Sequence, residues 1–249
     1  MDTTNESIAS SDSIIHNQPK IIVIIPAHNE ERTVGGVVLS IKNQVNWDIL
    51  VVDDFSGDST ANEACNAGAE VISLDFHQGA WSAIQTGLQL ANQEHYDIVV
   101  TMDADGQHSA RCLKDLVLPI VGNKAEVVIG VCRDRVGAVR SIGWRYFRRI
   151  SGLSIVDLTS GFRAYSSNTF EVLLSSEASM LSYQDIGVLM LLRNAKMSIV
   201  EQKVEMFGRM VGTSRVYPSW SSIWIYVTQT TLLCISKISI LRNRKDEKA

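Results

Sequence analysis

The sequence predicts an α/β fold in which helices cover both faces of a mostly parallel sheet. Short β-branched runs alternate with longer stretches of helical periodicity from Ile21 to Gly130. Acidic and amide side chains follow three of these runs directly. Strand–helix alternation calls for a three-layer α/β/α arrangement, and ligands of such sheets bind beyond the carboxyl ends of the strands.

The first half of the chain contains regularly alternating strands and helices. A β-branched run closed by Pro26 indicates a strand buried on both faces. Apolar residues three and four apart indicate the helices, and Gly68 ends the second of them. The expected strands are Ile21–Ile25, Ile49–Val52, Glu70–Leu74, Ile98–Met102 and Glu126–Gly130, and the expected helices are Glu30–Asn43, Thr60–Ala67, Ala80–Ala91 and Arg111–Val121.

The second half is less regular. A turn at Thr159–Arg163 is expected to feed a short strand, and the strand expected last is Ser198–Val204. The expected helices are Arg140–Leu153, which is basic, and Ser182–Ala195, which is apolar. The predicted organisation is a flexible polar tail at 1–19, one domain at 20–217, and an amphipathic helical segment with a basic end at 218–249.

Composition excludes several classes of protein. Across 249 residues the formal net charge is -4, which argues against a nucleic-acid partner, since such proteins carry a basic field. Positive charge gathers only locally, between Arg133 and Arg149, and indicates an anionic partner there. The 4 cysteines form no C-x-x-C pair, so they indicate neither a zinc site nor a disulfide framework, and we expect a reducing, cytoplasmic setting.

The segment Ile223–Leu241 is the candidate for membrane contact. It is apolar but interrupted by Thr, Gln and Ser, and Lys237 would cost about 3 kcal/mol at a bilayer centre. Two readings stay open: a helix packed on the core, or an interfacial helix beside a basic end. The second reading places the protein peripherally on the cytoplasmic face of a membrane.

Asp103-Ala104-Asp105 follows a predicted strand and is the candidate metal site. Two carboxylates that flank one small residue can turn toward a single hard cation, Mg²⁺ or Mn²⁺, which binds carboxylates together with substrate phosphates. Such a cation would stabilise a departing diphosphate. Asp53, at the end of another strand, suits a ribose hydroxyl or a base N–H. Asp58 is expected to cap the following helix.

Six segments taken in order resemble a known family: "IIVIIPAHNEERTVGGVVLSI", "ILVVDDFSGDST", "HQGAWSAIQTGL", "DIVVTMDADGQH", "LTSGFRAY" and "GRMVGTSR". Together they are similar to the inverting GT-A glycosyltransferases, family 2, in the branch of dolichyl- or polyprenyl-phosphate sugar synthases. The resemblance covers about Lys20 to Arg215. It implies a Rossmann-like GT-A domain that uses a nucleotide-diphosphate sugar and a divalent cation.

The resemblance also implies roles for particular residues. The nucleotide sugar would be held by Pro26, Ala27, Asn29, Glu30, Asp53, Asp103, Ala104 and Arg133, and the metal by Asp103, Asp105 and Gln107. Phosphates of donor or acceptor would meet Arg163, Arg209, Ser214 and Arg215, and the catalytic residues would be Asp105, Arg163 and Asp185. Arginine suits these contacts because its guanidinium pairs bidentately with phosphate.

The acceptor stays open at this point. Polyprenyl phosphate is favoured by the R-x-x-G-x-S-R loop and the amphipathic end of the chain. A saccharide hydroxyl, as in surface polysaccharide synthesis, is favoured by Asp185, since a hydroxyl needs a general base. Asp185 has a second reading as a carboxylate at a helix start. Two distant alternatives are a non-catalytic nucleotide-sugar binder and a response-regulator receiver, whose acidic pair would have to follow the first strand. The oligomeric state is not indicated.

Overall fold

The computed structural model describes residues 18–132, 138–208, 227–232 and 234–235. In chain order the elements are β1 (Ile21–Ala27), α1 (Val34–Lys42), β2 (Asp48–Asp53), α2 (Thr60–Asn66), β3 (Glu70–Ser73), α3 (Ala80–Gln93), β4 (Ile98–Thr101), α4 (Leu113–Val121), β5 (Val127–Val131), α5 (Ala138–Ser151), β6 (Arg163–Ser166), α6 (Phe170–Leu173), α7 (Ser176–Ser179), α8 (Ile186–Asn194) and β7 (Ile199–Lys203). A short helix also covers 227–232 and continues at 234–235.

Within these residues the strands form one 7-stranded sheet in the order β3-β2-β1-β4-β6-β5-β7. Every neighbouring pair is parallel except the two made by β6, which runs antiparallel to β4 and to β5. The expectation of a mostly parallel α/β sheet is confirmed. The place of β6 between β4 and β5 was not among the expectations.

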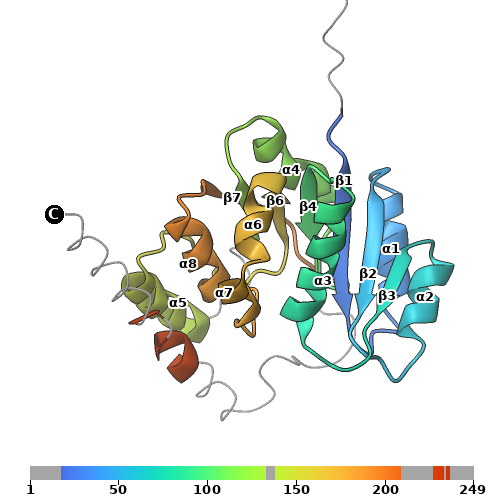
Figure 1. Cartoon of the computed structure of the whole chain (residues 1–249), viewed down its shortest axis with the longest axis horizontal. Helices are drawn as coiled ribbons and strands as arrows, with labels where there is room; N and C mark the ends of the chain where they lie inside the picture. Colours follow the sequence, from blue (N-terminus) through green and yellow to red (C-terminus); the bar gives the residue numbers. More distant parts are fainter. Residues whose placement is uncertain (1–17, 133–137, 209–226, 233, 236–249) are drawn as a thin grey trace, which may run out of the picture.

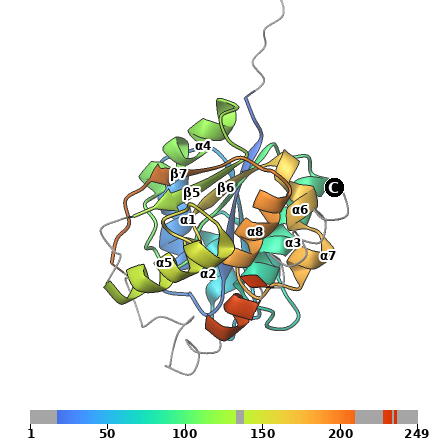
Figure 2. The same cartoon turned by 90° about the vertical axis from the view of Figure 1, so that its left-hand side faces the viewer.

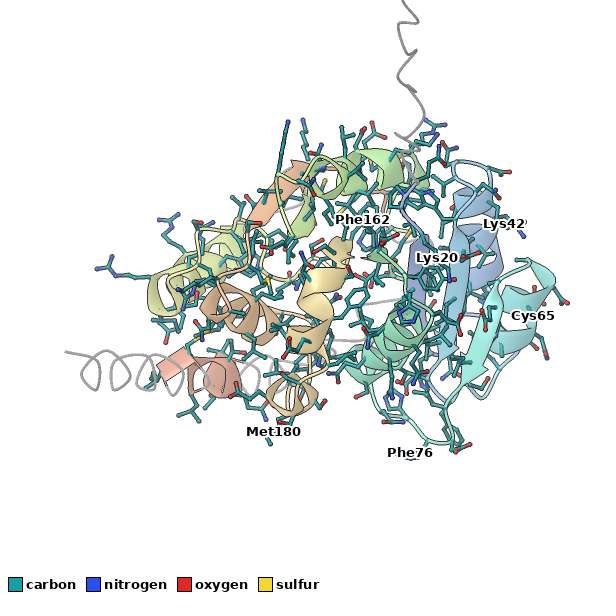
Figure 3. All side chains as sticks on the ribbon, turned by 45° about the horizontal axis from the view of Figure 1, so that its top comes forward. Lys20, Lys42, Cys65, Phe76, Phe162 and Met180 are labelled. Carbon is teal, nitrogen blue, oxygen red and sulfur yellow. The ribbon has the colours of Figure 1, made fainter. Side chains whose placement is uncertain are left out.

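Helices cover both faces of the sheet, as Figure 2 shows with α4 on one side and α6, α7 and α8 on the other. The alternation of β1 side chains explains this layering: Ile22 and Ile24 pack toward α3, while Val23 and Ile25 pack toward α1 and α4. Phe162 belongs to the core cluster that contains Val23 and Ile25, here called the second core, and lies in the interior (Figure 3). Each face therefore buries its own apolar cluster.

Most element boundaries agree with the sequence expectations to within a few residues, but two regions differ. The stretch from Ser167 to Ser179 forms a 3₁₀ turn followed by α6 and α7, which the sequence pattern did not indicate. Arg163, expected in a turn, is the first residue of β6. The tail at 1–17 and most of the 218–249 segment lie outside the described residues.

The part of the C-terminal segment that is described packs against the domain. Cys234 is fully buried and belongs to the same core cluster as α8, and the hydroxyls of Tyr146 and Thr231 are 3.3 Å apart. Leu232 and Ile235 face outward, with 62% and 57% of their surface exposed. In Figure 1 this segment (red) lies below α5. It therefore has one face on the core and one apolar face exposed. No helix in the described residues is long and apolar enough to cross a bilayer.

Candidate active site

The carboxyl ends of β1, β2 and β4 meet at one edge of the sheet, pointing downward in Figure 1. β1 is central, with Ala27 in register with Asp53 of β2 and Ile24 in register with Thr101 of β4. The loops that follow these three strands are consequently neighbours. A further backbone bond continues each ladder past the strand end: the Asp54 N–H donates to the Ala27 carbonyl at 2.8 Å, and the Met102 N–H to the Ile24 carbonyl at 3.1 Å.

The loop after β1 is tied to the loop after β2. Asn29 has a φ of 52°, a left-handed conformation that asparagine tolerates. Its N–H donates to Ser56 Oγ at 2.9 Å, and its Oδ1 accepts from the Gly57 N–H at 2.8 Å. The Glu30 N–H donates to Thr60 Oγ1 at 2.7 Å. These bonds place Asn29 and Glu30, two predicted nucleotide contacts, beside the end of β2.

Asp53 and Asp54 are adjacent in sequence but differ in how their carboxylates are used. Asp54 accepts from the N–H groups of Gln78 and Gly79, each at 2.7 Å, and so holds the loop that leads into α3. Asp53 is 5% exposed, and its Oδ1 is buried with no hydrogen-bond partner among the described residues. Buried carboxylate oxygens are seldom left unpaired. Asp53 is therefore the carboxylate whose environment calls for a donor from a ligand.

Asp103 and Asp105 lie on the turn after β4. The Asp103 side chain is 48% exposed. Asp105 is 7% exposed, and its Oδ1 accepts from the Gln107 N–H at 3.0 Å, which tightens the turn. The turn thus offers two carboxylates and a nearby side-chain amide, oxygen ligands of the kind that Mg²⁺ and Mn²⁺ prefer. The donor set fits a hard divalent cation.

Two further predicted contacts, Ala27 and Ala104, are each 3% exposed and pack inside the second core. A ligand that reached these positions would meet backbone atoms, because the methyl groups face inward. Pro26 is paired with Val52 within the sheet and is partly exposed. All three positions flank the acidic residues at the same edge.

His108 supports the acidic turn and was not identified from the sequence. It is 4% exposed, and its ring stacks on Phe162 with centroids 5.0 Å apart. Nδ1 accepts from the Asp103 N–H at 3.3 Å, so the ring proton is on Nε2, which lies 3.7 Å from Asp103 Oδ2. Its place next to Gln107 in the chain was the one available signal. His108 therefore supports the turn through the Asp103 backbone N–H.

Arg163 is buried rather than presented to solvent. Its exposure is 0%, and its guanidinium donates from Nε to the Ser160 carbonyl at 2.7 Å and from Nη2 to the Leu158 carbonyl at 3.2 Å. Nη1 has no hydrogen-bond partner among the described residues. The side chain therefore braces the turn before β6, where Gly161 leaves no room for a Cβ beside the Asp103 carboxylate. Direct contact between Arg163 and a phosphate stays a prediction.

Asp185 is the N-cap of α8. It is 9% exposed, and its Oδ1 accepts from the Gly187 N–H at 3.2 Å, so the helix-start reading describes its contact in this structure. Its neighbour Gln184 donates to Thr101 Oγ1 at 3.1 Å and to the Tyr165 hydroxyl at 2.8 Å. These bonds attach the start of α8 to the end of β4. Arg133, Arg209, Ser214 and Arg215 lie outside the described residues.

A groove of about 540 Å³ runs along α3 and contains none of the predicted site residues. Its walls are almost entirely uncharged amides and hydroxyls: Gln78, Ser82, Gln85, Thr86, Gln89, Asn92, Gln93 and Ser179, together with Leu174. The acidic turn lies outside it. Carboxylates gather at the strand ends and are absent from the lining of the groove, so the strand ends are the candidate site.

The chain is similar in sequence and in fold to several known proteins. The undecaprenyl-phosphate mannosyltransferase of Micrococcus luteus is 29% identical over 215 residues, covering 79% of this chain and 87% of that protein. The polyprenol monophosphomannose synthase of Mycolicibacterium smegmatis is 30% identical over 217 residues, covering 79% and 81%. Among solved structures, glucosyl-3-phosphoglycerate synthase from Mycobacterium tuberculosis, in complex with Mn²⁺, uridine diphosphate and phosphoglyceric acid, gives a TM-score of 0.67 at 21% identity, covering 88% and 78%.

The sheet order and the similarity to these solved structures show the GT-A fold. Residues 22–174 match the family described as glycosyl transferase family 2, and the chain belongs to that family. The resemblance expected from the ordered sequence segments is thereby confirmed, and the receiver alternative is wrong.

Proposed function

We propose that the protein is an inverting glycosyltransferase that moves a sugar from a nucleotide-diphosphate sugar to polyprenyl phosphate. The observation that carries this proposal is the convergence of Asp53, with its unpaired buried Oδ1, and the Asp103–Asp105 turn at neighbouring strand ends. The lipid acceptor is supported by relatives whose names specify undecaprenyl phosphate, polyprenol and dolichyl phosphate.

The loops after β1 and β2 would bind the nucleoside. Asp53 Oδ1 would accept from a ribose hydroxyl or a base N–H, which supplies the donor that this buried oxygen lacks. Asn29 and Glu30, locked onto the second loop, would line the same subsite, together with the backbone at Pro26, Ala27 and Ala104. A polar subsite of this kind binds the donor without taking part in the reaction.

Asp103, Asp105 and Gln107 would hold Mg²⁺ or Mn²⁺ against the diphosphate. When bound, the cation would neutralise the charge that develops on the leaving diphosphate. The protein's own contribution is to fix the two carboxylates: Asp105 through the Gln107 N–H, and Asp103 between His108 and Gly161. The acceptor then approaches the anomeric carbon from the opposite face of the sugar, which inverts its configuration.

The test is turnover with a panel of nucleotide sugars, with and without polyprenyl phosphate. In the Asp105→Ala variant metal-dependent turnover should fall at least about 100-fold, because even supporting contacts of metal sites are worth 10–100-fold. Asp115→Ala, an exposed carboxylate on α4, is the matched control and should keep its activity. Full activity of Asp105→Ala would overturn the metal assignment. An absence of metal-dependent donor hydrolysis in the parent protein would favour a non-catalytic binder.

A saccharide hydroxyl is the second candidate acceptor, favoured by the carboxylate of Asp185 at the start of α8. The Asp185→Asn variant separates the two acceptors, because asparagine keeps the helix cap but cannot take up a proton. With a phosphate acceptor, which is already anionic, kcat should be unchanged. With a hydroxyl acceptor, kcat should fall by about 10²–10⁴-fold, the usual contribution of a general base.

We further propose peripheral contact with the cytoplasmic face of a membrane. Two observations support it: Leu232 and Ile235 expose apolar surface next to α5, and α5 carries Arg145, Arg148 and Arg149. Basic and apolar side chains side by side favour anionic lipid surfaces. The protein should sediment with vesicles that contain anionic lipid, and the Leu232→Ser/Ile235→Ser double variant should bind them more weakly. The predicted acceptor contacts Arg209, Ser214 and Arg215 would bind the phosphate of the polyprenyl acceptor.

A further inference from the structure

Two histidines and one aspartate gather beside the predicted nucleotide subsite and have no part in the mechanism above. His28 directly follows β1, Asp54 directly follows β2, and His77 lies in the loop that leads into α3. One ligand atom from each residue lies within 4.8 Å of the other two, and the imidazole centroids are 4.3 Å apart. The strand order, rather than sequence proximity, brings these three side chains together.

The Asp54–His77 pair is set up to bind a cation. His77 Nδ1 is 2.9 Å from Asp54 Oδ2, so the ring N–H donates to the carboxylate. A tetrahedral zinc ion with bonds of about 2.0–2.1 Å separates neighbouring ligand atoms by about 3.3 Å, so a metal could replace this proton with a shift of a few tenths of an ångström. The other carboxylate oxygen of Asp54 accepts from the Gln78 N–H at 2.7 Å, the kind of supporting bond that orients ligating carboxylates.

His28 has the proton arrangement of a metal ligand. Its Nδ1 is 2.7 Å from the Asp54 carbonyl oxygen, which can only accept, so Nδ1 carries the proton and the lone pair is on Nε2. Metal-bound histidines commonly donate their second ring N–H to a backbone carbonyl in this way. The Asn29 amide lies 2.9 Å from Nε2, and a cation at that nitrogen would take the place of the amide N–H.

We propose that His28, Asp54 and His77 form a binding site for a transition-metal cation of the zinc class. Imidazole nitrogens suit Zn²⁺, Cu²⁺ or Ni²⁺, whereas Mg²⁺ prefers oxygen ligands only. The site is open on one side, since the His77 side chain is 56% exposed, which leaves a position for water or another ligand. The protein thus holds two cation sites of different chemistry, an oxygen site on the turn after β4 and a nitrogen-containing site here.

Occupancy would crosslink three loops. His28 belongs to the loop after β1, Asp54 to the loop after β2, and His77 to the loop before α3, where Asp54 already holds the Gln78 and Gly79 N–H groups. A metal that binds only the folded arrangement stabilises it according to ligand concentration. Zinc should therefore raise the melting temperature of the intact protein, independently of any catalysis.

The experiment is a calorimetric zinc titration of the full chain in buffer free of other divalent cations, with melting curves alongside. The parent protein should bind one zinc ion and melt at a higher temperature with zinc. His77→Asn should weaken binding at least tenfold, and His28→Gln should do likewise. His95→Asn is the matched control, because His95 is exposed and has a φ of 56°, a conformation that asparagine accepts. It should bind zinc as the parent does.

The Asp105→Asn variant changes the oxygen site on the turn after β4 and should leave zinc binding at His28, Asp54 and His77 unchanged. Because zinc binding is measured without turnover, the result does not depend on the proposed glycosyl transfer. The proposal is overturned if the parent protein binds no zinc, if both histidine variants bind it with unchanged affinity, or if Asp105→Asn abolishes binding. Cobalt adds a spectroscopic check: intense visible bands in the parent that disappear in His77→Asn would indicate an ordered site containing that imidazole.

Discussion

The carboxylate of Asp103 rests directly on the backbone of Gly161, so that a methyl group added to Gly161 would lie 2.6 Å from Oδ1. No real side chain tolerates that separation. The Gly161→Ala variant should therefore push Asp103 away from the turn and reduce metal-dependent turnover by about 100-fold, the usual effect of a misplacement near 1 Å. Steady-state rates over a range of Mn²⁺ concentrations would measure this.

The control for this variant is Gly36→Ala on α1. A methyl group there meets no atom within 4 Å, and alanine favours helix by up to about 1 kcal/mol over glycine. Gly36→Ala should leave turnover unchanged and raise the urea midpoint. If Gly161→Ala kept the parent's dependence on Mn²⁺, the close contact would have no bearing on the metal ligand.

Gly87 allows α3 to pack closely on β1. A Cβ at this position would lie 2.7 Å and 2.9 Å from two side-chain carbons of Ile24. Overpacking of this kind costs about 1–3 kcal/mol, partly offset by the helix preference of alanine. Gly87→Ala should lower the free energy of unfolding in urea. Adding Ile24→Val should cost less in that background than alone, and additive effects in this double-mutant cycle would contradict the clash.

The four cysteines should differ sharply in reactivity. Cys65 is exposed, whereas Cys112, Cys132 and Cys234 are buried. Burial, aided by the nearby charge of Asp185, raises the pKa of Cys234 to about 11, so at pH 8 about one molecule in a thousand carries the thiolate there. Mass spectrometry after brief maleimide treatment should show one label on the native protein and four after denaturation. Rapid labelling of Cys234 would mean that the C-terminal helix opens readily.

Asp58 should stabilise the start of α2 in a pH-dependent way. Burial acts to raise its pKa, but hydrogen bonds from Thr60 and from the Glu31 N–H outweigh this and lower the pKa below 3.8. A lowered folded-state pKa means that the contribution is complete above the unfolded value and is lost as pH falls through the folded one. Asp58→Ala should cost about 1 kcal/mol at pH 7 and little near pH 2, as urea unfolding would measure. An equal cost at both pH values would contradict this assignment.

Much of the fold follows from local patterns. The β-branched run of β1 is buried on both faces, so apolar and polar residues do not alternate along it. The length of the run and its closing proline still indicate a strand. The missed elements, α6 and α7, are four residues each and gain their order from packing on α3 and α8. Local propensity carries no signal for helices that tertiary contacts create. The antiparallel insertion of β6 is likewise a long-range pairing.

The juxtaposition of candidate residues was predictable where one strand end supplies them. Asp103 and Asp105 share a turn, and Asp58 precedes α2 and accepts from the Thr60 N–H, so sequence spacing alone brings these groups together. The group of His28, Asp54 and His77 is different, because its members come from three loops and meet only through the strand order. Arg163 differs again, since it was expected in a turn and is instead the first, fully buried residue of β6.

The sheet consists of two unequal halves, and β6 alone joins them. On one side lie β1 to β4, with the acidic turn, and on the other lie β5 and β7. Within the sheet, the ladder across this junction is made by Arg163–Ser166, together with the Phe162 carbonyl, which accepts from the Gly130 N–H at 2.8 Å. Outside the sheet, a bridge between His108 and Met206 and the packing of α4 on β4 and β5 also link the halves. Amide hydrogen exchange in β6 would therefore report on the local stability of this junction.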